Sequence, residues 1–141
     1  MTDPRHNAIL QEFLPLTSWE DRYKKIISMG QALAPLADEL KTDDVKVRGC
    51  QSQVWLVAKL NEAGNILFQA DSDALIVKGL VALLIRFYND RTPEEILNLQ
   101  PEFLRELGFE ANLSPSRANG LQAMIKQMKY YALAFQALRQ R

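Results

Sequence analysis

The feature that most restricts the fold is an apolar stretch from Ala74 to Tyr88, which only Lys78, Gly79 and Arg86 interrupt. The stretch is shorter than the roughly 20 residues that a membrane span requires. The residues Asp71-Ser72-Asp73 just before it are typical of the start of a helix. The sequence therefore predicts a central helix buried in the core, with Lys78 and Arg86 on its solvent-exposed side.

Further helices are predicted by apolar residues at helical spacing, combined with capping residues and prolines. Ser18 is a candidate N-cap with Asp21 three residues later, and Pro35 ends the helix that follows. Thr92-Pro93-Glu94-Glu95 combines a capping hydroxyl, a proline at the first helical position and a capping glutamate. The helices expected besides the central one span residues 7–14, 19–34, 93–99, 101–107 and 115–140.

The helix predicted after Ser114-Pro115 carries an apolar stripe that should pack against the core. Two methionines belong to this stripe and are interpreted as core residues rather than as part of a metal or cofactor site. Gly108 is expected to close the preceding short helix in a left-handed conformation. The stripe consists of Leu121, Met124, Ile125, Met128, Ala132, Phe135 and Leu138.

A β-hairpin is predicted between the second helix and the central one. Residues 51–60 are rich in β-formers, residues 61–65 are typical of a turn, and residues 66–69 form a second short strand. The polar segment from Pro35 to Arg48 is expected to be a long surface loop that leads to the entrance of this hairpin. The expected fold is α+β: one domain over residues 1–141, mostly helical, with helices packed on a small antiparallel sheet.

The charge balance restricts the partners of the chain. The 17 Lys and Arg residues equal the 17 Asp and Glu residues, so no overall field would attract nucleic acid or an anionic membrane. The segment Met1 to Leu10 lacks the apolar core of a secretory signal. The lack of this apolar core and the presence of an unpaired cysteine, which stays reduced in the cytosol, together favour a cytoplasmic protein.

Cys50 is the only cysteine, and it follows Gly49 at the hairpin entrance. A single cysteine cannot form an intramolecular disulfide. Together with the one histidine, it cannot supply the three or four ligands of a zinc or iron-sulfur site. His6 is expected near a frayed terminus, so a cysteine-histidine hydrolase is implausible. Cys50 is then either a nucleophile that works as a single sulfur or a buried packing residue. Arg48 is equally well interpreted as a cation that activates the thiol or as a solvated loop charge.

Three separated blocks resemble the signature of the SufE family of sulfur-acceptor proteins. The resemblance extends over nearly the whole chain, and Ser114 stands where the family more often has threonine, with the capping hydroxyl preserved. The blocks are Gly49 to Trp55, Asp71 to Ala74 with Ile76 to Leu80, and Leu113 to Arg117 with Gly120-Leu121.

The resemblance implies that Cys50 receives sulfur as a persulfide from a SufS-like or CsdA-like cysteine desulfurase and passes it on for iron-sulfur cluster assembly. It also implies a SufE/IscU-like fold and an accessory protein without a cofactor of its own, because the pyridoxal phosphate belongs to the desulfurase. A downstream cluster scaffold is a further expected partner, and the expected assembly is a monomer or a weak homodimer.

The resemblance nominates Asp73 and Arg117 as supporting residues. Asp73 is equally well interpreted as a charge that favours the N-terminus of the central helix, whereas Arg117 lies in a first helical turn, where the helix dipole disfavours a cation. A functional role is therefore favoured for Arg117. Two other functions stay open: an adaptor that binds through residues 35–48, with Cys50 only packed, and a cluster scaffold, against which the shortage of ligands argues.

Overall fold

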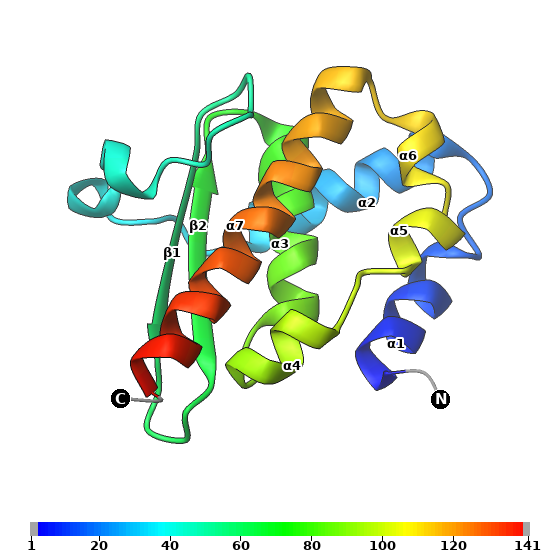
Figure 1. Ribbon diagram of the computed structural model, residues 1–141. Helices are drawn as coiled ribbons and strands as arrows, with labels where there is room; N and C mark the ends of the chain where they lie inside the picture. The colour runs from blue at the N-terminus through cyan, green and yellow to red at the C-terminus, as the bar shows by residue number, and fades with distance from the viewer. Residues whose placement is uncertain (1–2, 140–141) are drawn as a thin grey trace.

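The computed structural model describes residues 3–139, which fold into helices packed on one side of a two-stranded antiparallel sheet (Figure 1). The hairpin lies at one side of the molecule, α3 and α7 cross next to it, and α1 and α5 lie at the opposite side. The predicted α+β, mostly helical class is confirmed. The elements are α1 (Pro4–Phe13), α2 (Trp19–Ala32), η1 (Asp38–Leu40), η2 (Asp43–Val45), β1 (Val54–Leu60), β2 (Ile66–Ser72), α3 (Leu75–Tyr88), α4 (Pro93–Asn98), α5 (Phe103–Glu106), α6 (Phe109–Asn112) and α7 (Pro115–Arg139).

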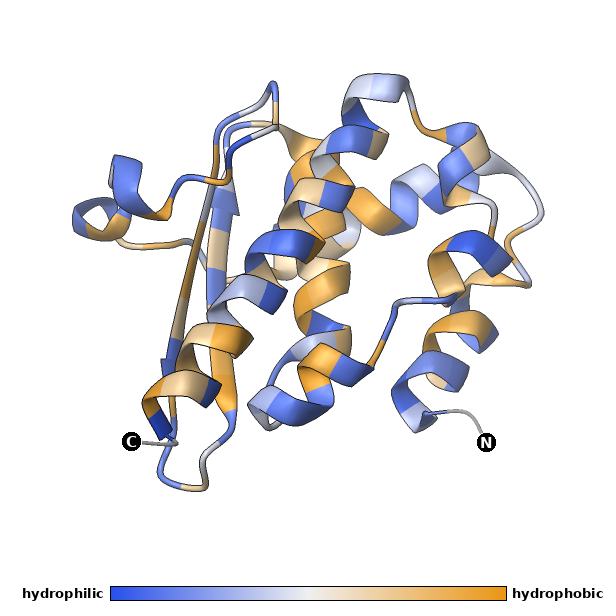
Figure 2. Cartoon of the chain, viewed as in Figure 1, coloured by the Kyte–Doolittle hydropathy of each residue, from blue (hydrophilic) through white to orange (hydrophobic). Residues whose placement is uncertain are grey.

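Helix α3 is the predicted central helix, and nearly its whole circumference is buried. Figure 2 shows it as the most continuously hydrophobic helix of the chain. The helix begins at Leu75, one residue after the predicted Ala74. Asp71 and Ser72, which were predicted to mark its start, belong to β2, where Ser72 pairs with Val54. Ile66, Phe68 and Ala70 alternate toward the core and carry the strand three residues past its predicted end.

Lys78 and Arg86 form ion pairs instead of only marking a wet side of α3. Lys78 Nζ lies 3.3 Å from Asp71 Oδ1, and Arg86 forms a bidentate pair with Glu12 of α1. Both side chains are partly buried, so the two cations tie α3 to β2 and to α1.

Helices α2 and α3 pack backbone against backbone where Gly30 meets Gly79. A Cβ atom at residue 79 would lie 2.0 Å from the carbonyl oxygen of Ile26, and one at residue 30 would lie 2.7 Å from the amide nitrogen of Gly79. No side chain fits at either position while the helices remain this close. This crossing fixes the position of α3, the helix that forms one wall of the site described below.

Strand β1 begins at Val54 rather than at the predicted Gln51, because residues 49–53 form a turn. Its register runs from Val54 opposite Ser72 to Leu60 opposite Ile66. The face that carries Val54 and Leu56 is buried against the helices, and the hydroxyl of Tyr131 in α7 donates to the Leu56 carbonyl oxygen at 2.7 Å.

The segment 35–48 is more ordered than the predicted surface loop. It contains η1 and η2, and the side chains of Leu36 and Val47 are only 5% and 3% exposed. The buried carboxylate of Asp71 accepts a hydrogen bond from the Leu36 amide at 3.1 Å and pairs with Lys41 at 3.3 Å. The segment is therefore fastened to the outer face of the sheet.

Helix α1 starts at Pro4, three residues before the predicted start, because Asp3 caps it by accepting a hydrogen bond from Arg5. His6 is consequently only 6% exposed, and its Nε2 lies 3.3 Å from Glu106. The expectation that His6 lies near a frayed end was wrong.

The capping box of α4 and the left-handed Gly108 after α5 are confirmed, whereas α6 was not predicted. In α7 the apolar stripe is buried from Leu121 to Ala132, but Leu138 is 58% exposed, because the helix extends past the core. The predicted end at Gln140 lies outside the described residues.

Candidate functional site

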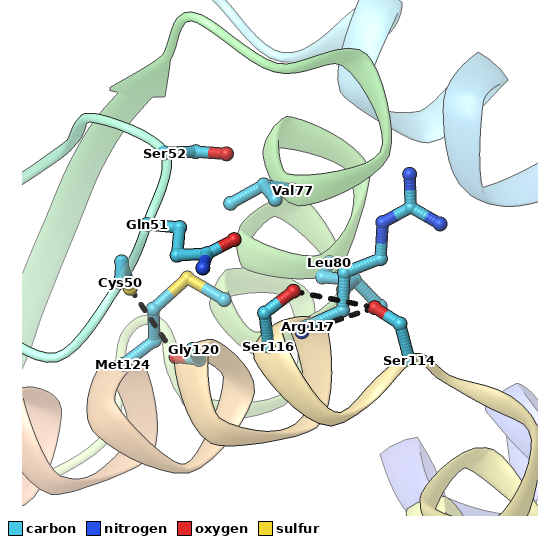
Figure 3. A pocket seen from close by; sticks show the side chains of 10 residues that line it. All are labelled: Cys50, Gln51, Ser52, Val77, Leu80, Ser114, Ser116, Arg117, Gly120 and Met124. Carbon is cyan, nitrogen blue, oxygen red and sulfur yellow. Dashed lines mark hydrogen bonds between the residues drawn. The ribbon is translucent and has the colours of Figure 1, made fainter.

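Cys50 lies at the predicted hairpin entrance, in a turn that crosses α7 (Figure 3). The backbone of Gly49 has a φ of +95°, a conformation that favours glycine. This turn directs the Cys50 side chain to α7, where its Sγ donates a hydrogen bond to the carbonyl oxygen of Gly120 at 3.5 Å. The thiol is therefore partly buried against a helix far away in the sequence.

The turn approaches α7 closely because small residues face it. A Cβ atom at Gly49 would lie 3.3 Å from the Cβ of Ala123, and one at Gly120 would lie 3.3 Å from the Cys50 sulfur. Larger side chains at these positions would push the turn away from the helix. The site thus depends on two glycines and an alanine more than on polar groups.

Two sets of hydrogen bonds, called clamps below, hold the turn on either side of Cys50. Before it, the Val47 amide donates to the Val54 carbonyl oxygen at 2.8 Å. After it, the Gln53 amide donates to Asp73 Oδ1 at 3.0 Å, and the Asp73 amide donates back to the Gln53 carbonyl oxygen at 3.2 Å. Residues 48–52 form a short arch between the clamps, and Cys50 lies within it.

The arch closes one side of a recess of about 340 Å³. The α3 residues Val77 and Leu80 and the α7 residue Met124 supply apolar walls, and Figure 3 shows the Gln51 side chain extending over the recess. The recess has room for an atom or small group attached to the Cys50 sulfur. Its lining consists of Cys50, Gln51, Ser52, Val77, Leu80, Ser114, Ser116, Arg117, Gly120 and Met124.

Burial raises the pKa of the Cys50 thiol, which keeps the sulfur protonated and weakly nucleophilic at neutral pH. Arg48 is exposed and borders a different hollow, so it does not activate the thiol. In the resting structure Cys50 is a protected thiol, and its reaction requires either deprotonation in place or movement of the arch.

Arg117 lines the recess, whereas Asp73 does not. The Arg117 amide donates to Ser114 Oγ at 3.3 Å in the first turn of α7, and its guanidinium lies across the recess from the thiol (Figure 3). Asp73 lies directly before Ala74, the N-cap of α3, and its side chain does not cap an amide of that helix. Its carboxylate accepts the hydrogen bond from the Gln53 amide at the end of the arch.

Sequence reasoning missed Gly120 and Met124 as neighbours of the thiol. Met124 was assigned to the core, and it is fully buried, but it also lines the recess. The spacing of four residues between Gly120 and Met124 places both on the face of α7 that meets Cys50. That spacing was the available signal.

Residues 3–139 contain no group of three or more His, Cys, Asp and Glu side chains positioned to hold a metal ion. Within the same residues, no helix has the length and apolar character to cross a membrane.

A family model described as SufE, Fe-S metabolism associated domain, matches residues 7–132. Among solved structures, the fold is similar to the solution structure of a hypothetical protein from Thermus thermophilus. That match has a TM-score of 0.78 and 22% sequence identity, and it covers 97% of this chain and 99% of the other. The structural match shows a shared fold, and the family match includes Cys50, Asp73 and Arg117.

Proposed function

The chain belongs to the SufE family, whose domain is associated with iron-sulfur metabolism, and on this premise we propose that Cys50 is a sulfur acceptor. The proposed donor is a pyridoxal-phosphate-dependent cysteine desulfurase of the SufS-like or CsdA-like kind. The chain would act as an accessory protein that activates the desulfurase and carries its sulfur, in the cytoplasm and without a cofactor of its own.

The single observation that carries the proposal is the recess beside the only thiol of the chain. Cys50 Sγ packs against Gly120 at the edge of a hollow of about 340 Å³, which has apolar side chains from α3 and α7 on one side and polar side chains from the arch and the start of α7 on the other. A persulfide adds one sulfur atom beyond Sγ, and this hollow can hold it. A second thiol in the chain could attack the persulfide, form a disulfide and release the sulfur, and the sequence contains no second cysteine.

The proposed step is a thiol exchange at the terminal sulfur of a persulfide on the desulfurase. The Cys50 thiolate attacks that sulfur, a new S–S bond forms on Cys50, and the S–S bond of the donor breaks. The donor cysteine leaves as a thiolate with the electron pair of the broken bond. One proton from Cys50 is released, and no external oxidant or reductant is consumed.

The protected thiol gives the arch a role in this step. Because burial raises the Cys50 pKa, attack is favoured once the arch moves and exposes the sulfur to water or to the partner. Asp73 would then be a positioning residue that sets how firmly the arch is held. Arg117 is exposed and forms no ion pair within residues 3–139, so we assign it to contact with the partner.

The carried sulfur would pass to a scaffold that builds iron-sulfur clusters. This destination agrees with the family's association with iron-sulfur metabolism. Transfer would repeat the same exchange, with an acceptor thiolate attacking the terminal sulfur on Cys50.

The test is incubation of the protein with a SufS-like desulfurase and free cysteine, followed by mass spectrometry under non-reducing conditions. We expect a mass increase of one sulfur atom, located at Cys50 by peptide mapping and absent from Cys50→Ser. The same samples give desulfurase turnover, which wild-type protein should raise.

Full stimulation of the desulfurase by Cys50→Ser would overturn the carrier mechanism and favour an adaptor that uses Cys50 only for packing. Arg117→Ala should weaken binding of the desulfurase and leave the labelling rate of Cys50 in the free protein unchanged. A changed labelling rate would instead place Arg117 among the residues that hold the arch.

A further inference from the structure

A second hollow lies on the other side of the arch, between the segment that precedes Cys50 and α7. It measures about 810 Å³ and is wider than the recess around the thiol. Arg48 and Gly49 border this groove, whereas Cys50 and Gln51 border the recess. The arch is thus the wall that separates the two hollows.

One stripe of α7 forms a long side of the groove. Its residues recur at helical spacing, from Asn119 through Ala123, Lys126 and Tyr130 to Leu133. The stripe has Ala123 against the arch, polar residues at Asn119 and Lys126 on either side of it, and an apolar far end. Tyr130 and Leu133 are 67% and 52% exposed, so nothing within residues 3–139 covers the apolar end.

Cations concentrate at the end of the groove near the arch. Arg48 and Lys126 are exposed and form no ion pair within the described part of the chain. Lys46 has only a weak pair with the exposed Asp43, at 3.9 Å. Asp44 is the one acidic residue that lines the groove, so its lining carries a positive excess in a chain whose formal net charge is zero.

The fourth cation in the lining, Lys129, already binds backbone groups of the protein itself. Lys129 Nζ donates to the carbonyl oxygens of Ile96, Leu97 and Leu99 at 2.8, 3.2 and 2.9 Å. It fixes the C-terminal end of α4 and leaves Leu97 as part of the apolar lining. The cations available to a ligand are therefore Lys46, Arg48 and Lys126.

We propose that this groove docks an acidic segment of the cysteine desulfurase, with carboxylates against Lys46, Arg48 and Lys126 and an apolar side chain against Tyr130 and Leu133. The proposal rests on the proposed function, because that function supplies the identity of the partner. The positive charge of the groove lining is complementary to an acidic segment of the partner. The exposed side chains of Tyr130 and Leu133 would pack against an apolar side chain of the same segment.

A partner that binds in the groove would act on the thiol through the backbone of the arch. Arg48 and Cys50 are separated only by Gly49, so a carboxylate that binds Arg48 contacts the arch one residue from the thiol. The groove would hold the partner while leaving the recess side of the arch free for the sulfur.

The test compares three variants in a titration with a SufS-like desulfurase, measured by calorimetry at two salt concentrations. Lys126→Glu replaces a groove cation, Tyr130→Ala removes the apolar anchor, and Lys24→Glu makes the same charge change on the exposed face of α2, away from the groove. Loss of an interfacial charge pair weakens binding by roughly tenfold or more and reduces its salt dependence. For Lys126→Glu we expect weaker binding with a reduced salt dependence. For Tyr130→Ala we expect weaker binding with an unchanged salt dependence. Lys24→Glu should bind with wild-type affinity.

Wild-type affinity for both groove variants would overturn the docking proposal while leaving the sulfur-acceptor function intact. Absence of sulfur on Cys50 in the wild-type protein would instead overturn the function, whatever the groove variants do. A second copy of this chain is the other occupant that the groove could take, and sedimentation of the free protein tests for it. If the wild type were a dimer that both Lys126→Glu and Tyr130→Ala dissociate, the groove would bind a second copy, and docking of the desulfurase there would be overturned.

Discussion

The sulfur of Cys50 lies 3.5 Å from the backbone oxygen of Gly120, and a methyl group at residue 120 would approach that sulfur to 3.3 Å. The absence of a side chain at one helical position therefore allows the thiol to rest against α7. Changes at this contact should alter the reactivity of the thiol more than the stability of the fold.

Gly120→Ala should expose the thiol with little cost in stability. The added methyl would lie 3.3 Å from the sulfur, so the Cys50 side chain must move by a few tenths of an ångström and loosen its contact with α7. Alanine gains up to about 1 kcal/mol over glycine in a helix interior. We expect labelling of Cys50 by a maleimide to accelerate by roughly tenfold, which corresponds to about 1.4 kcal/mol of lost protection. Asn119→Ala, at the neighbouring exposed position, should label at the wild-type rate. Equal rates for Gly120→Ala and wild type would show that the Gly120 contact does not protect the sulfur.

The free energy of unfolding of the wild-type protein should decrease in alkaline solution, where the Cys50 thiol loses its proton. Because burial raises the folded-state pKa of the thiol, the unfolded chain loses its proton at lower pH than the folded one. Stability then declines as the pH rises above the unfolded pKa. The expected decline is small, because the thiol is only partly buried.

The measurement is the difference in urea unfolding free energy between wild type and Cys50→Ser, followed from neutral to alkaline pH. Tyr88 and Tyr131, whose pKa values burial also raises, are present in both proteins and cancel in the difference. A difference that does not change with pH would contradict a raised Cys50 pKa.

Asp73→Ala should loosen the arch from its far end. The variant loses the 3.0 Å hydrogen bond from the Gln53 amide but keeps the backbone bond between the two residues. We expect faster thiol labelling and a loss of about 1 kcal/mol in unfolding free energy, typical of one hydrogen bond. Asp73→Asn keeps an acceptor oxygen and should recover most of both effects. If Asn and Ala behaved alike, the carboxylate would not act through Gln53.

Asp71→Asn should free the segment 35–48 from the sheet. Burial favours a raised pKa for Asp71, but the amides of Leu36 and Ser72 and the ammonium groups of Lys78 and Lys41 outweigh it and hold the pKa below its usual value. A lowered folded pKa contributes stability that is present above the unfolded pKa and is lost as the pH falls through the folded one.

We therefore expect Asp71→Asn to lose about 2 kcal/mol at neutral pH, as for a buried charge network that loses one partner. The deficit relative to wild type should shrink in acid, and amide exchange in residues 36–47 should accelerate. Asp38→Asn is the matched control, because Asp38 also pairs with Lys41 but is fully solvated. A deficit that persists unchanged in acid would contradict the role assigned to the charge.

The sequence was sufficient for the fold class, the hairpin and the central helix, because periodicity and capping residues act locally. It was misleading at Asp71-Ser72-Asp73, where a polar triplet has the composition of a helix start. The pairing of Ser72 with Val54 across the sheet makes Asp71 and Ser72 the end of a strand, and local composition does not contain that pairing.

The position of Cys50 could be predicted, but its environment could not. Gly120 is 70 residues away in the sequence, and it reaches the thiol only after α7 has packed against α3. His6 shows the same limit, because its burial depends on the Asp3 cap, on the pairing of that cap with Arg91 and on Glu106 from α5. Such contacts depend on tertiary packing and leave no periodic trace in the sequence.

The glycine crossing of α2 and α3 has a consequence for the capacity of the recess. Val77 and Leu80, which form its wall on α3, flank Gly79, where a Cβ atom would collide with the Ile26 carbonyl oxygen at 2.0 Å. Any side chain at residue 79 would shift α3 away from α2 and move both wall residues with it. The size of the recess beside Cys50 therefore depends on the packing of α2 against α3, at a glycine that does not line the recess.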